Sequence, residues 1–262
     1  MTRYSFVLRT AARQQWVYRA EMAMRAVQMV LFMGIFVALW STAFGVSGRA
    51  ELAGYSLAEV VWYLAMTETI ALSTSRVFVE ISEAVRAGGV AYQLARPLSY
   101  PLYQVANSLG NSTPRFALNL LTATAVAGLG TGQWPGSLRG ILAFVGMAAL
   151  ALLLDSLIAV LIGLLAFWIE EVTPAFWIYQ KLLFTVGGLF LPLEMFPQWL
   201  RRLTRWLPFQ FITYAPARAF VDFEPGFVLR AAAGQAIYVT VLSALVALAW
   251  GRARRRLVIH GG

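Results

Sequence analysis

The stretch LRGILAFVGMAALALLLDSLIAVLIGLLAFWI, from Leu138 to Ile169, decides the class of fold. Its charged residues are Arg139, next to its start, and Asp155, near its centre. About 20 consecutive apolar residues are enough for an α-helix to cross the hydrocarbon core of a bilayer. We therefore predict that this stretch is a membrane-spanning helix.

The rest of the chain has the same character. Of its 262 residues 60% are hydrophobic and 13% are charged, whereas about a quarter of the residues of a soluble domain are charged. We predict an all-α integral membrane protein in which residues 1–262 form a single transmembrane domain of six helices, with no room for an attached ATPase domain. The other five apolar runs cover about residues 24–44, 57–79, 103–129, 175–191 and 227–250.

The run at 103–129 is the least regular of the six. Asn107, Asn111, Pro114 and Arg115 occupy its first half. Polar side chains and proline are unfavourable in a helix that faces lipid. We expect the start of this span to be broken or to face water.

Residues 1–22 have the spacing of an amphipathic helix. Arg9 and Arg13 lie on the face opposite to an apolar stripe, as in a helix that lies along the membrane surface. We predict an interfacial helix here, and the alternative is an ordinary juxtamembrane tail. The stripe consists of Tyr4, Val7, Leu8, Ala11, Tyr18 and Met22.

Two segments between the apolar runs are too polar to lie in lipid. Residues 80–101 carry several charges and end with Pro97 and Pro101, so they are predicted to form a structured loop. Residues 192–226 alternate aromatic side chains with arginines. This second pattern is typical of short helices at one face of the membrane, where guanidinium groups meet lipid phosphates.

The distribution of basic residues sets the orientation. Lys and Arg are about twice as numerous on the side of the six predicted spans that holds both termini and residues 80–101. We therefore expect both termini and this segment to be cytoplasmic, and residues 192–226 to lie on the outer face.

The composition also excludes several classes of function. The chain has no Cys, its one His is His260, and it lacks the G-x-x-x-x-G-K-[ST] motif that cradles nucleotide phosphates. We expect no catalytic residue, no metal site and no bound cofactor, and hence no enzyme. The net charge of +9 comes from arginines beside the apolar runs, which favours anionic lipids over nucleic acid as partners.

Two motifs resemble a known family. The run Glu83-Ala-Val-Arg86-Ala-Gly88, followed by Leu94-Ala-Arg96-Pro97-Leu98, resembles the cytoplasmic coupling segment of ABC type-2 (ABC-2) exporter permeases. The run Gly188-Leu-Phe-Leu-Pro192-Leu193, with Phe196-Pro197, is similar to the proline-broken outer segment of the same family. These permeases are the six-span membrane subunits of ATP-driven exporters.

The resemblance implies partners that the chain itself does not contain. A separate ABC ATPase subunit, in two copies, would hydrolyse ATP with Mg, and a second permease subunit, the same or a related one, would complete the membrane part. The complex would lie in the bacterial plasma (inner) membrane and move substrate outward.

An ATPase can do work on a membrane bundle only through a rigid cytoplasmic protrusion in packed contact with it, and this segment is the best candidate. We predict that Glu83 and Arg86 make polar or charge-assisted contacts with the ATPase, while Val85, Val90 and Leu94 pack the short helix. The alternative is a plain solvated loop. Where the family commonly has acidic residues after the glycine, this chain has Gly89, Val90 and Ala91. The full set assigned to coupling is Glu83, Val85, Arg86, Gly88, Leu94, Arg96 and Pro97.

On the outer side, Pro192 and Pro197 interrupt the helix that begins at about residue 175. A gate at this place would prevent substrate from leaking back. We predict an apolar gate around this interruption, and the alternative is a passive helix hairpin packed on the bundle. The gate residues are Leu191, Pro192, Leu193, Phe196 and Pro197.

Two acidic residues lie inside predicted spans, Glu68 and Asp155. A carboxylate at the bilayer centre costs about 2.5 to 3.5 kcal/mol, so both should face protein or water. They mark either the substrate path or a subunit interface, or they make interhelical hydrogen bonds, for which Ser73, Ser156 and Tyr63 are candidate partners.

The function predicted from these features is that of an export permease powered by a separate ATPase, with an amphipathic or lipid-linked substrate. The alternatives are a membrane assembly or anchoring subunit that transports nothing and an ion-coupled secondary carrier. Drug, glycolipid, polysaccharide and peptide exporters share this composition, so the substrate stays open, as does the choice between homodimer and heterodimer.

Overall fold

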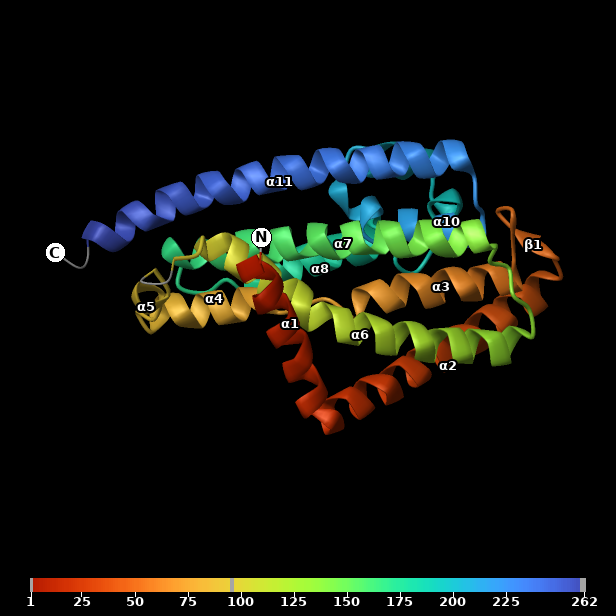
Figure 1. Cartoon of the computed structure of the whole chain (residues 1–262). Helices are drawn as coiled ribbons and strands as arrows, with labels where there is room; N and C mark the ends of the chain where they lie inside the picture. The colour runs from red at the N-terminus through yellow and green to blue at the C-terminus, as the bar shows by residue number, and fades with distance from the viewer. Residues whose placement is uncertain (1, 95–96, 260–262) are drawn as a thin grey trace.

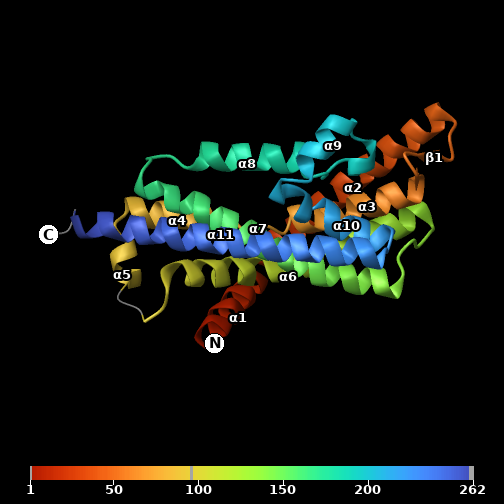
Figure 2. The ribbon, with the colours of Figure 1, turned by 90° about the horizontal axis from the view of Figure 1, so that it is seen from above.

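The computed structural model describes residues 2–94 and 97–259, which form a long helical bundle (Figures 1 and 2). The main helices are α1 (Thr2–Val17), α2 (Arg19–Ser47), α3 (Leu57–Ala71), α4 (Val77–Arg86), α6 (Tyr100–Thr131), α7 (Leu138–Leu164), α8 (Thr173–Val186) and α11 (Pro225–Ile259). The short elements are the antiparallel pair β1 (Glu51–Leu52) and β2 (Tyr55–Ser56), helices α5 (Val90–Leu94), α9 (Gln198–Thr204) and α10 (Tyr214–Val221), and the 3₁₀ turns η1 (Leu165–Phe167), η2 (Leu193–Met195) and η3 (Pro208–Phe211).

Three helices of the described part of the chain are long and apolar enough to cross a membrane. They cover Arg19–Ser47, Leu138–Phe167 and Pro225–Arg256. The middle one corresponds to the apolar stretch at 138–169, which was predicted to span the membrane. The chain is helical almost throughout, as predicted for an all-α membrane protein.

The sequence predicts one helix over residues 57–79, but the backbone breaks there between α3 and α4. Hydroxyl groups at the break bond to backbone carbonyls: Thr69 Oγ1 donates to Ala65 O (2.7 Å) and Thr74 Oγ1 donates to Ala71 O (3.1 Å). Such bonds compete with the helical ladder. Arg115 donates to Thr74 O (3.3 Å) and so satisfies a carbonyl that the break leaves outside a helix.

The run at 103–129 differs from expectation in the opposite direction. Helix α6 is continuous from Tyr100 through Pro114 to Thr131. Its polar side chains find protein partners: Asn111 accepts from Gln15 of α1 (3.1 Å), and Asn107 donates to Glu80 of α4 (2.8 Å). Because neighbouring helices supply these partners, the predicted break is absent. Asn111 and Arg115 line a cavity of about 560 Å³, so the alternative expectation, that this start faces water, stays a prediction.

Helix α1 is shorter than the predicted interfacial helix, because it ends at Val17 and residues 19–22 already belong to α2. Its stripe is only partly the predicted one: Ala11 is buried, whereas Tyr18 is 54% exposed. The stripe faces α6, and α1 crosses that helix at an angle to the bundle (Figure 1).

The sequence predicts that the fifth apolar run continues as a helix to about Leu191, but helix α8 ends at Val186. The carbonyls that follow accept hydrogen bonds from side chains of other elements: Gly187 O from Thr213 (2.7 Å) and Leu189 O from Thr67 (2.9 Å). Tertiary contacts therefore satisfy the backbone that no longer continues the helix.

The connections gather at two opposite ends of the bundle (Figure 1). At one end lie the β1–β2 hairpin, the 132–137 connection and α10, and Trp62 Nε1 donates to Gln133 O (2.8 Å) there. At the other end lie α4, α5, η1 and the last turns of α11, where Arg256 donates to Phe167 O (3.3 Å). We call them the hairpin end and the α4 end.

Candidate functional site

The predicted coupling segment begins inside the bundle, on α4. Val77, Phe78 and Ile81 are buried, and α4 lies against α7 at Gly163. A Cβ atom added to Gly163 would lie 2.9 Å from Ile81 Cβ, so the two helices approach as closely as a glycine allows. The rings of Phe78 and Phe176 stack with their centroids 4.0 Å apart. Helix α4 is thus anchored to α7 and α8 along its buried face.

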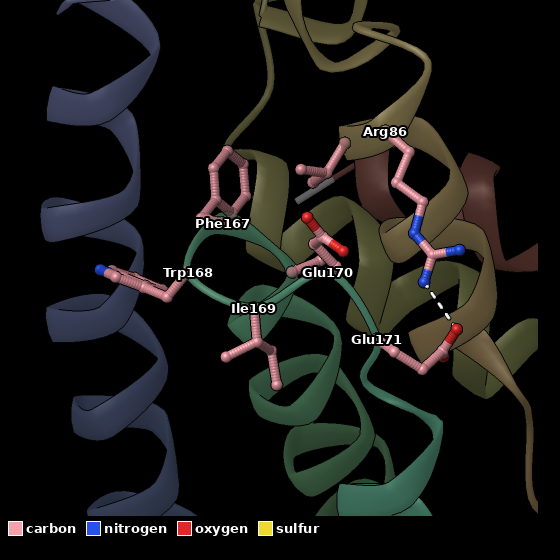
Figure 3. A pocket seen from close by; sticks show the side chains of 8 residues that line it. Arg86, Phe167, Trp168, Ile169, Glu170 and Glu171 are labelled. Atoms are coloured by element: carbon pink, nitrogen blue, oxygen red, sulfur yellow. Dashed lines mark hydrogen bonds and ion pairs between the residues drawn. The ribbon is translucent and has the colours of Figure 1, made fainter.

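The opposite face of α4 is exposed and charged. Glu83 and Arg86 point outward, and Arg86 donates to Glu171 Oε2 at 3.0 Å (Figure 3). Glu171 also accepts from Thr173, through its hydroxyl (2.6 Å) and its backbone N–H (3.0 Å). The hydrogen bonds from Thr173 and Arg86 lower the pKa of Glu171 to about 2, so the ion pair is charged at neutral pH.

A cavity of about 620 Å³ lies beside this ion pair. It is lined by Val85 and Arg86 of α4 and by residues 166–171, which follow α7. Trp168 points from this turn toward α11 (Figure 3), and the guanidinium group of Arg256 lies 5.8 Å from its ring centroid. The surface at the α4 end is therefore built from two segments that lie far apart in sequence.

The other predicted coupling residues continue along the same end. Gly88 lies two residues after the end of α4 and has a φ of 68°, a conformation that favours glycine. Val90 of α5 is fully buried. Pro97 O accepts from Arg3 (3.3 Å), which ties the segment to α1. Leu94 is the last residue of α5, and Arg96 lies outside the described residues.

The predicted outer gate residues do not share one surface. Pro192 and Leu193 are buried, whereas Leu191 is 38% exposed and Pro197 is exposed. Phe196 is half-buried between these extremes. The segment alternates between facing the core and facing outward.

One arginine holds this turn in shape. The guanidinium group of Arg201 donates to three backbone carbonyls of the turn, those of Leu193 (3.1 Å), Glu194 and Phe196 (3.3 Å). A planar guanidinium has donors in several directions, which a lysine ammonium cannot place in the same way.

The carboxylate of Glu194 joins this turn to its neighbours. It accepts from Tyr55 of β2 (3.1 Å) and from Tyr214 of α10 (2.6 Å), and Arg218 lies 3.4 Å away. Burial and the Glu194 carboxylate raise the pKa of both tyrosines, so they stay protonated and keep donating. The hairpin end is thus held together by a polar cluster.

The two intramembrane acids lie in the centre of the bundle, and both are 3% exposed. Asp155 Oδ1 accepts from Tyr179 of α8 (2.6 Å), which is an interhelical hydrogen bond. Among the residues that the structure describes, Glu68 Oε1 is buried without a hydrogen-bond partner. Both acids line one cavity of about 150 Å³.

The partners predicted for these acids were wrong. Ser156 pairs with Ser108 (2.9 Å), Ser73 accepts from Asn119 (3.0 Å), and Tyr63 donates to Gly188 O. Each of the three already has a hydrogen-bond partner elsewhere in the bundle. Asp155 bonds instead to Tyr179 of α8, and both acids line the cavity.

Residues 25–261 match the protein family described as ABC-2 family transporter protein. The chain belongs to the ABC-2 family. No curated protein matches the chain. Membership confirms the resemblance that the two motifs suggested, and it supports an ABC transporter permease, a multi-pass membrane protein that associates with an ABC ATPase subunit.

Sequence reasoning missed several side chains that shape this ABC-2 permease. The acidic pair Glu170 and Glu171 follows the apolar run at 138–169, and nothing near it in the sequence indicates its partner on α4. Arg201 is one of several arginines in residues 192–226, and Tyr179 is one of several aromatic residues in its apolar run. Their roles depend on partners distant in sequence, so no local pattern could identify them.

Proposed function

We propose that this ABC-2 family chain is the membrane-spanning permease subunit of an ATP-driven exporter. It moves an amphipathic or lipid-linked substrate outward with ATP that a separate ABC ATPase subunit hydrolyses, and ATP and Mg bind only in that subunit. The observation that carries the proposal is the exposed, charged surface at the α4 end. It is formed by Glu83 and Arg86 of α4, a helix anchored in the bundle, and by Glu171 of the turn before α8.

The proposed topology has six crossings with both termini in the cytoplasm. Helices α2, α6, α7 and α11 cross alone, α3 crosses together with α4, and α8 crosses together with the turn that follows it. With 14 residues, α8 is about 21 Å long, less than the roughly 30 Å of hydrocarbon. Non-helical backbone at such depth is acceptable where protein satisfies it, as Thr67 and Thr213 do for the turn after α8.

The geometry suggests how the ATPase acts on the permease. Two ATPase subunits that close on ATP push against the α4 end of each of two permease subunits, the second being the same chain or a related one. Because the Ile81 side chain and the backbone at Phe78 of α4 pack closely on Gly163 of α7, a displacement of α4 passes directly to α7. The arginines near the membrane faces bind anionic lipids of the bacterial inner membrane.

Cross-linking tests the contact directly, because the chain has no native cysteine. We expect Glu83→Cys to cross-link to the co-expressed ABC ATPase through a maleimide–benzophenone reagent, whose maleimide adds to the thiol and whose photoactivated benzophenone inserts into a C–H bond of the neighbouring subunit. Glu51→Cys is the matched control, since Glu51 is also an exposed glutamate and lies at the hairpin end. Cross-linking from Glu51 and none from Glu83 would overturn the proposal.

ATP hydrolysis distinguishes a permease from an anchoring subunit, which would also bind an ATPase. In the reconstituted complex, replacing Glu83 and Arg86 together with alanine should uncouple hydrolysis from outward movement while membrane insertion is unchanged. An anchoring subunit would show no transport for the double variant to lose.

A further inference from the structure

The cavity in the centre of the bundle has an unusual lining. Its polar groups include Glu68 and Asp155, and much of the remaining surface is aromatic. The rings come from α2, α8 and the turn after α8, and they belong to Phe32, Phe176, Tyr179, Phe184 and Phe190. The cavity is therefore mainly apolar and carries two acids.

The acids are not equally satisfied. Tyr179 donates to Asp155, but within the described part of the chain nothing donates to Glu68 Oε1. A buried polar atom without a partner is costly, and buried charges are normally paired. No Lys or Arg side chain of the described residues lines this cavity. Gln180, whose side-chain amide also lines the cavity, makes no hydrogen bond to Glu68 Oε1 in this structure. A donor on a bound molecule would complete the carboxylate.

The lining identifies the chemistry of that donor. An ammonium group donates hydrogen bonds to carboxylates and is also attracted to the faces of aromatic rings. A hard divalent cation instead takes six or more oxygen ligands, which an aromatic lining does not supply. A cavity of about 150 Å³ holds a molecule the size of benzene. The group that fits is a small hydrophobic amine, or the amine end of a larger amphipathic molecule.

The opening of the cavity fits such a ligand. Phe32 and Phe190 are 37% and 38% exposed, so the cavity reaches the surface of the bundle beside α2 and the turn after α8. An adjoining cavity of about 560 Å³ shares lining residues with it, among them Thr74 and Gln180, and carries both arginines and glutamates. The opening at Phe32 and Phe190 lies at the side of the bundle, where an amphipathic molecule partitions into the bilayer.

We infer that Glu68 and Asp155, together with the surrounding rings, bind the protonated amine of a hydrophobic or lipid-like ligand that arrives from the membrane. The inference rests on the proposed export function only in treating this ligand as a substrate. Glu68 accepts from the ammonium group, Asp155 is held in place by Tyr179, and the rings enclose the apolar part.

Binding to the purified full chain in lipid nanodiscs tests this site without an ATPase. The probe is 4-fluorobenzylammonium followed by fluorine NMR, with 4-fluorobenzyl alcohol as the uncharged probe of the same shape and empty nanodiscs as background. We expect saturable binding that favours the ammonium over the alcohol by at least about tenfold. Equal binding of the two probes would overturn the inference.

Variants separate the acid from the cavity. Glu68→Gln keeps the shape and should remove the preference for the ammonium, whereas Ala71→Phe should fill the cavity and exclude both probes. Glu51→Gln, at the hairpin end, should behave as the wild type. An unchanged preference in Glu68→Gln contradicts the inference, and a melting midpoint of each variant identifies any that fails to fold.

The two proposals can fail separately. Amine binding without a cross-link from Glu83→Cys contradicts only the export function. A cross-link from Glu83→Cys without amine binding contradicts only the amine site.

Discussion

At the scale of single residues, the conformation of Gly188 determines how the chain leaves α8. Its φ is 77°, and an added Cβ would lie 3.0 Å from Tyr214 Cβ and 3.1 Å from Tyr63 Oη. An L side chain is strained in this region by about 1 to 2 kcal/mol. Glycine is thus required at this position for two reasons: the positive φ and the close approach of two tyrosines.

We expect Gly188→Ala to lower the free energy of unfolding by about 1 to 3 kcal/mol, since strain and crowding add. The melting midpoint of the purified protein in detergent, followed by near-UV circular dichroism, measures the loss. Gly146→Ala is the control, because Gly146 lies inside α7 with nothing within 4 Å of an added Cβ. Alanine favours a helix over glycine by about 1 kcal/mol, so its midpoint should not fall. Equal midpoints for the two variants would refute the argument.

At the scale of elements, α1 is a packed part of the bundle and not only a surface helix. A Cβ added to Gly110 of α6 would lie 2.5 Å from Leu8 O and 2.7 Å from Ala11 Cβ. Gln15 adds hydrogen bonds to Asn111 and from Arg115 (both 3.1 Å). The contact therefore depends on a glycine on one helix and a small residue on the other.

Gly110→Ala should loosen α1, because the new methyl group meets backbone atoms that cannot rotate away. Trypsin cleavage at the exposed Arg9 and Arg13 measures the effect. If undocking becomes easier by about 1.4 kcal/mol, cleavage accelerates about tenfold. Gly128→Ala on the same helix is the control, since its nearest neighbour, Trp62, lies at an ordinary 3.9 Å. Identical cleavage in both variants would show that α1 is not held at Gly110.

At the scale of the whole molecule, the bundle separates two sets of connections. The α4 end contains Arg86 paired with Glu171, and the hairpin end contains Glu194 with its tyrosines. In the proposed topology these ends lie on opposite sides of the membrane. The two ends lie on opposite sides only if each of the six segments crosses the membrane in the direction that the proposed topology gives it.

Labelling with a membrane-impermeant maleimide tests this separation. We expect Glu51→Cys to react in right-side-out spheroplasts and Glu83→Cys to react only after permeabilisation. The wild type, which has no cysteine, is the blank. Reaction of both sites from the same side would contradict the six-crossing topology and the cytoplasmic position of the α4 end.

Much of this architecture could be predicted from local sequence. The run at 138–169 contains enough apolar residues for a span, and α7 with η1 covers Leu138–Phe167. The family resemblance rested on short motifs around Arg86 and Pro192, and the family match confirmed it. Both depend on properties of consecutive residues, namely hydrophobic length and order along the chain.

The boundaries and the partners of polar groups were decided by the tertiary structure. The sequence predicts a broken or water-facing start for α6 and a single helix over residues 57–79. In the structure α6 is continuous, and its polar side chains bond to Gln15 and Glu80. The run at 57–79 is interrupted after α3, where hydroxyl groups and Arg115 stabilise the break. Sequence required Glu68 and Asp155 to avoid lipid, but only the fold brought them to one aromatic cavity. Hydrophobic length is a property of one segment, whereas satisfying a buried polar group requires atoms from another, and folding alone brings the two together.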